Sequence, residues 1–165
     1  MQQQKDSDKG ILLLGKHSQH LELDARLLGQ HLALFGVTRG SDSAVINRLM
    51  TQGRQKAFIG MASKTNPRQF LRWLKDGHAV VYFPDQDYGV KRSIMASLFD
   101  VPAVFTTAPF TLHKLSGCLL YFYDSFYEGE KLVIVIEPLV LPDANAEVFT
   151  QGLATFIESK IAAHP

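Results

Sequence analysis

The 165-residue chain lacks the features that define several classes of protein. It has a single cysteine, Cys118, which excludes a disulfide-built scaffold and a zinc site made of several thiolates. It contains no run of about 18 apolar residues, so no segment is expected to cross a bilayer as a helix. The first nine residues are polar, so no secretory signal is predicted. These absences favour a cytoplasmic location.

Several chemical motifs are missing as well. There is no glycine-rich phosphate loop and no G-x-S-x-G turn, so Ser93 and Ser116 are not predicted to be nucleophiles. His17 and His20 have zinc-like spacing but no further ligand cluster, so no metal site is predicted. Hydrophobic residues make up 46% of the chain and charged residues 20%, which excludes a disordered chain. We therefore predict one folded domain over residues 1–165.

The net charge of +1 conceals an uneven distribution. Residues 1–75 hold twelve Lys/Arg and five Asp/Glu, whereas residues 76–165 hold five Lys/Arg and eleven Asp/Glu. A basic surface built from the first half would attract phosphates, acidic proteins or anionic lipid. Scattered, solvated charge explains the same composition equally well.

Hydrophobic periodicity predicts alternating strands and helices. Short apolar runs predict strands over residues 10–15, 33–37, 57–61, 79–83, 118–123 and 132–136, with a loop over 124–131. Helical spacing predicts helices from about 18 to 32, 41 to 53, 67 to 77 and 109 to 115, and one through 149–161. This order predicts an α/β fold in which helices flank a mixed sheet.

One histidine stands where α/β proteins place their ligands. His17 directly follows the first predicted strand, and Glu22 lies five residues further on, at the start of the next helix. A carboxylate on one imidazole nitrogen raises the basicity of the other, which then takes a proton from an alcohol. The pair predicts a general base, although a histidine near a helix start more often caps or packs.

The turn after the strand over 79–83 carries two more carboxylates, Asp85 and Asp87, in the segment PDQDYG. They could bind a metal or act as acid and base, but aspartate in a turn also accepts local backbone amides. We favour a structural or substrate-positioning role, with Asp87 as the preferred participant.

Five blocks together resemble a known family. The segment GKHSQHLELDARLLG carries His17, Glu22 and Arg26, and PDQDYG follows at a compatible distance. Between them lie Thr38-Arg39, Gly53-Arg54 and the basic helix RQFLRWLKDG. Over residues 9–165 these features resemble the late lipid A biosynthesis acyltransferases, the lauroyl and myristoyl transferases. The resemblance implies a glycerolipid-acyltransferase-like fold.

The resemblance also implies a reaction. A fatty acyl chain would pass from an acyl carrier protein thioester, or acyl-CoA, to a hydroxyl of a lipid A precursor, with no further cofactor and no metal. His17 would be the general base and Glu22 would orient it. The implied substrate contacts are Arg39, Arg54, Arg26 and Asp87. Implied partners are acyl carrier protein, the lipid acceptor and the membrane surface, but no nucleic acid, at the cytoplasmic face of the bacterial inner membrane.

The sequence departs from the family in ways that keep two alternatives open. We expect the domain to be incomplete relative to the family, without its N-terminal membrane helix and C-terminal segment. Asp24-Ala25 replaces a Gly-Gly pair, and Gly40 replaces a proline. The chain could instead be an acyltransferase of the same superfamily acting on another lipid or glycan. It could also be a remnant that binds lipid or a partner without turnover.

Overall fold

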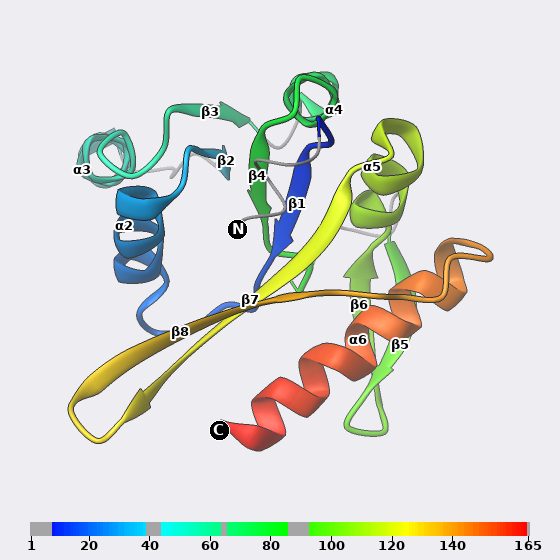
Figure 1. Cartoon of the computed structure of the whole chain (residues 1–165). Coiled ribbons are helices and arrows are strands. Elements are labelled where there is room, and N and C mark those ends of the chain that lie inside the picture. Colours follow the sequence, from blue (N-terminus) through cyan, green and yellow to red (C-terminus); the bar gives the residue numbers. More distant parts are fainter. Residues whose placement is uncertain (1–7, 39–43, 64–65, 86–92, 165) are drawn as a thin grey trace.

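A computed structural model describes residues 8–38, 44–63, 66–85 and 93–164 (Figure 1). Six strands form one sheet in the order β3-β2-β4-β1-β7-β8. They are β1 (Ile11–Leu14), β2 (Leu34–Thr38), β3 (Gly60–Ser63), β4 (Ala79–Tyr82), β7 (Leu119–Glu128) and β8 (Lys131–Pro138). All neighbouring strands are parallel except β7 and β8. The predicted α/β fold with a mixed sheet is therefore confirmed.

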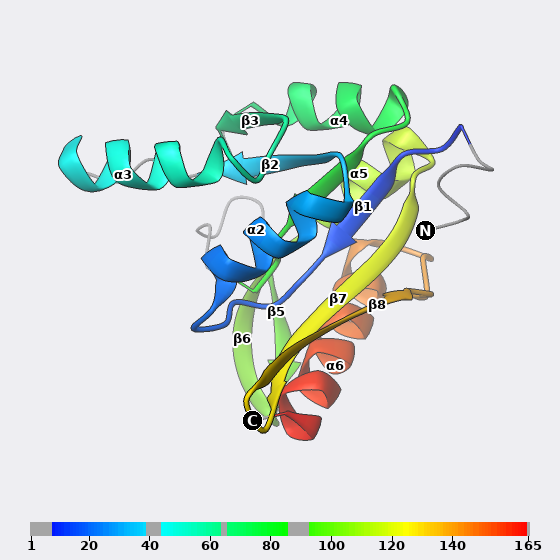
Figure 2. The same cartoon turned by 60° about the vertical axis from the view of Figure 1, so that its left-hand side comes forward.

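Helices cover both faces of this sheet (Figure 2). They are α2 (Leu21–His31) on one face and α4 (Pro67–Lys75), α5 (Ala108–Ser116) and α6 (Ala146–Ala163) on the other. Helix α3 (Ala44–Arg54) lies against α2. Side chains of β1 alternate between the faces, as the pleat of a strand requires. Leu12 and Leu14 join a buried cluster with α4, α5 and α6. Ile11 and Leu13 join a second cluster with Leu28 of α2. Among the described residues, no helix is long and apolar enough to span a membrane.

Two sequence predictions about strands are wrong. The loop expected over 124–131 is instead strand on both sides of a two-residue turn, in which Gly129 has φ of +59°. The polar residues Asp124 and Ser125 favour a loop in the sequence, but both side chains are buried in the structure. The strand expected over 57–61 begins only at Gly60, because α3 runs to Arg54. The backbone N–H groups of residues 55–58 then donate to carbonyl oxygens in the last turn of α3, so these residues form turns instead of a strand.

A second hairpin was not predicted at all. Strands β5 (Ser93–Leu98) and β6 (Val101–Thr106) pair in antiparallel fashion and pack against α6 (Figure 1). Their turn consists of Phe99 and Asp100, both with positive φ of 51° and 59°. Such a turn usually contains Asn-Gly or Asp-Gly, so the sequence gives no hairpin signal here.

The chain leaves β1 through a glycine in very close contact with the sheet. A Cβ at Gly15 would lie 2.5 Å from Cε1 of Tyr123 and 3.1 Å from Cε1 of Phe83. Tyr123 is buried in β7 and cannot easily move aside. Only glycine therefore lets the segment after β1 lie directly on this ring, and that segment carries His17.

Candidate active site

The carboxyl ends of β1 and β4 bring an imidazole and a carboxylate together. The register pairs Leu14 with Tyr82, so the third residue after each, His17 and Asp85, leaves the sheet beside the other. Oδ1 of Asp85 lies 2.7 Å from Nδ1 of His17. Oδ2 of Asp85 accepts the backbone N–H of His17, also at 2.7 Å. Both the ring and the backbone of His17 are thus held by one carboxylate.

This contact decides what the imidazole can do. An ionised carboxylate only accepts hydrogen bonds, so the ring proton sits on Nδ1 and Nε2 keeps its lone pair. The hydrogen bond that Nδ1–H donates to Asp85 raises the pKa of His17 above its ordinary value of 6.5; partial burial opposes this rise, and the charge of Asp85 adds to it. The His17 side chain is 40% exposed, whereas Asp85 is 17% exposed. His17 is therefore a partly exposed imidazole of raised pKa, with Nε2 free of the Asp85 contact.

Glu22 does not occupy the place that the sequence suggested. In the structure it binds Arg54 at the end of α3, and Nε of Arg54 lies 3.0 Å and 3.2 Å from the two carboxylate oxygens. Nη2 of Arg54 also contacts Glu22. Because α2 begins at Leu21, the Glu22 side chain leaves the helix toward α3 instead of folding back to His17. The carboxylate on the imidazole is that of Asp85.

Three predicted site residues do gather in one place. Glu22, Arg26 and Arg54 line a pocket of about 300 Å³ between α2 and α3, together with Ala25, Met50, Gly53 and Ala57. Two guanidinium groups beside one carboxylate favour an anionic ligand such as a phosphate. The other two predicted substrate contacts, Arg39 and Asp87, lie outside the described residues.

The sequence also missed polar residues of β7. Lys16 pairs with Asp124, and Ser125 donates a hydrogen bond to Asp24 in α2. His20 lies with Nε2 3.0 Å from Oγ of Ser125. In the part of the chain that the structure describes, no three His, Cys, Asp or Glu side chains gather as metal ligands. Only a known strand order could have placed residues 124 and 125 beside the His17 segment.

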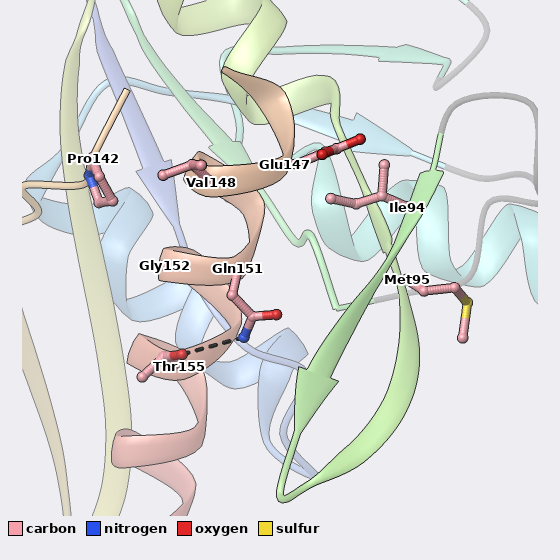
Figure 3. A pocket seen from close by; sticks show the side chains of 8 residues that line it. All are labelled: Ile94, Met95, Pro142, Glu147, Val148, Gln151, Gly152 and Thr155. Carbon is pink, nitrogen blue, oxygen red and sulfur yellow. Dashed lines mark hydrogen bonds between the residues drawn. The ribbon is translucent and has the colours of Figure 1, made fainter. Parts of the chain in front are cut away.

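An apolar groove of about 800 Å³ lies between β5 and α6 (Figure 3). Its apolar lining consists of Ile94, Met95, Pro142, Val148 and Gly152, and its polar lining of Glu147, Gln151 and Thr155. Met95 and Val148 are 60% and 41% exposed, which is high for large apolar side chains. Gln151 joins the two walls, because its amide donates to and accepts from the backbone of Ser97.

The whole chain, residues 1–165, matches the family model described as "Bacterial lipid A biosynthesis acyltransferase". It is 39% identical over 162 residues to the lipid A biosynthesis lauroyltransferase of Escherichia coli K12, covering 95% of this chain and 53% of that protein. It is 38% identical over 104 residues to a lipid A biosynthesis acyltransferase of Haemophilus influenzae, covering 63% of this chain and 32% of that protein. It is 32% identical over 135 residues to the lipid A biosynthesis palmitoleoyltransferase of E. coli K12, covering 79% of this chain and 44% of that protein. The chain thus spans about half the length of the curated relatives it matches.

Proposed function

The chain belongs to the bacterial lipid A biosynthesis acyltransferase family, and from this membership we propose that it transfers a fatty acyl chain from an acyl carrier protein thioester to a hydroxyl of a lipid A precursor. The observation that carries the proposal is the pairing of His17 with Asp85 at the carboxyl end of the sheet. Parallel sheets place ligands at this end. The proposed location is the cytoplasmic face of the inner membrane, in peripheral contact with its surface.

The proposed reaction uses His17 as the general base. Nε2 takes the proton of the acceptor hydroxyl while the hydroxyl oxygen attacks the thioester carbonyl carbon. Nδ1–H stays hydrogen-bonded to Asp85, whose negative charge stabilises the imidazolium. The tetrahedral intermediate then collapses and expels the thiolate, which takes the proton from Nε2. The products are the ester and a free thiol, and no covalent bond to the protein forms.

In this proposal Asp85 takes the orienting role that was expected of Glu22. Glu22 instead fixes Arg54 in the pocket between α2 and α3, where Arg26 is the second cation. We assign that pocket to a phosphate of the acceptor or of the carrier's prosthetic group, since guanidinium groups bind phosphates through paired hydrogen bonds. Arg39 and Asp87 stay proposed substrate contacts.

The groove between β5 and α6 is the proposed seat of the acyl chain. Replacing Val148 with tryptophan is expected to lower transfer of a lauroyl group about tenfold while butyryl transfer stays unchanged. The indole would fill the groove, and each methylene that loses its apolar contact costs about 0.8 kcal/mol. The measurement is the initial rate with each acyl donor. Val140→Trp is the matched control, because Val140 is 92% exposed and lies outside the groove. Equal losses with both donors would contradict the assignment.

The substrates are tested by pairing donors with acceptors. Lauroyl-acyl carrier protein and lauroyl-CoA are each incubated with the chain and either a lipid A precursor or a glycerolipid. We expect an ester product from the carrier-bound donor and the lipid A precursor. Transfer to the glycerolipid alone would favour another acyltransferase of the superfamily. Binding of carrier protein or anionic vesicles without any turnover would favour the non-catalytic remnant.

A further inference from the structure

The segment from Lys16 to Asp24 is held by both neighbours of its own strand. β1 lies between β4 and β7, and Leu14 is in register with Tyr82 on one side and Phe122 on the other. His17 turns toward Asp85, which follows β4. Four other side chains of the segment belong to the network on the β7 side, namely those of Lys16, Ser18, His20 and Asp24.

The first contact to β7 lies immediately before His17. Nζ of Lys16 is 2.8 Å from Oδ1 of Asp124, and the two side chains are only 10% and 3% exposed. A buried ion pair is stable only in a narrow geometry, because each charge has lost its water. Unlike an exposed pair, this contact therefore fixes the position of residue 16 against β7.

The second contact lies just after His17, at the start of α2. Oγ of Ser125 donates to Oδ2 of Asp24 at 2.6 Å, and Asp24 is fully buried. Since the Ser125 proton goes to Asp24, Oγ is left to accept from Nε2–H of His20 at 3.0 Å. Ser18 donates to the same oxygen of Asp24 at 3.3 Å. This chain of hydrogen bonds ties residues 18, 20 and 24 to one serine of β7.

We propose that Asp124 and Ser125 are positioning residues that hold the 16–24 segment so that His17 meets Asp85. Neither side chain contacts the reacting atoms in the proposed mechanism. They act through the backbone on both sides of His17, and the inference rests on the proposed role of His17 as the base. A base displaced by about 1 Å loses much of its rate advantage, so loosening β7 from this segment would slow proton transfer.

Ser125→Ala tests the proposal, because it removes the hydroxyl without changing the charge near His17. The titration of His17 is followed by NMR, and kcat and KM are measured alongside. We expect the pKa of His17 to fall although Asp85 is intact, since the imidazole spends less time on its carboxylate. We expect kcat to fall about 10-fold to 100-fold with KM little changed. Ser125→Thr keeps a hydroxyl at this position, so its His17 pKa and its kcat are both expected to lie close to the wild-type values.

Ser159→Ala is the matched control, because Ser159 is exposed and its Oγ donates to the backbone carbonyl of Phe156 within α6. A lower melting temperature of Ser125→Ala with an unchanged His17 pKa would show a merely structural serine and overturn the proposal. If Ser125→Ala does not fold, the double variant Lys16→Met with Asp124→Leu replaces it, and an unchanged His17 pKa there overturns the proposal. Absence of turnover in the wild-type chain would reject the proposed function only, because the NMR titration still decides the positioning role.

Discussion

Acyl transfer is expected to fall by about 10²- to 10⁴-fold when His17 is replaced by alanine, because the variant has no group to take the proton of the acceptor hydroxyl. The fold is expected to persist. The side chain is 40% exposed, and its described contacts are with Asp85 and the ring of Phe83. The measurements are the initial rate with lauroyl-acyl carrier protein and the thermal melting curve.

A second variant separates loss of the base from loss of structure. His17→Gln keeps a side-chain N–H that can reach Asp85 but has no basic nitrogen, so it should be as inactive as His17→Ala. His31→Ala is the matched control, because His31 is an exposed histidine at the end of α2. Activity of His17→Ala within a few-fold of wild type would remove the basis of the proposed mechanism.

Asp85→Asn is expected to have the next largest effect, lowering kcat by about 10²-fold or more. The aspartate accepts two hydrogen bonds from His17, one from Nδ1–H and one from the backbone N–H. Asparagine has a single side-chain oxygen, and its amide nitrogen would face a second donor. One of the two contacts is therefore lost, together with the negative charge that stabilises the imidazolium.

The same variant should shift the pH dependence of kcat/KM. His17 must be neutral to act as a base, and Asp85 raises its pKa above 6.5, so wild-type activity is lost as the pH falls through that raised value. Without the carboxylate the pKa of His17 is lower, so the acid limb of the profile moves to lower pH. Asp143→Asn makes the same chemical change at an exposed residue that pairs with Lys114, and its profile should match wild type. An unshifted acid limb in Asp85→Asn would contradict the assigned role of Asp85.

The position of His17 could be predicted from the sequence, but its partner could not. The apolar run over 10–15 marks β1, and a histidine three residues past Leu14 has to lie at the carboxyl end of the sheet. Asp85 is 68 residues away, and it becomes a neighbour only because β4 returns to lie beside β1. Glu22 is only five residues from His17, so the sequence predicts it as the carboxylate partner of the imidazole. In the structure Asp85 is that partner, and Glu22 binds Arg54.

The polar residues of β7 show a second limit of sequence patterns. Asp124 and Ser125 follow directly on the apolar run over 118–123, so the sequence predicts a loop there. Their burial depends on Lys16 and on Asp24, which is 101 residues earlier in the chain. From the sequence alone, a polar side chain is predicted to be exposed, because its buried partner is not known. Burial of an apolar residue of the same strand, such as Phe122, can be predicted from its hydrophobicity.

The proposed base is assembled from three strands that are made at very different times during synthesis. β1 is synthesised before β4, and Asp85 follows His17 by 68 residues. The contacts of β7 come from residues 124 and 125, and Ser125 follows its partner Asp24 by 101 residues. The pKa of the His17 imidazole is thus raised only after β4 has docked beside β1 and has brought Asp85 to the ring.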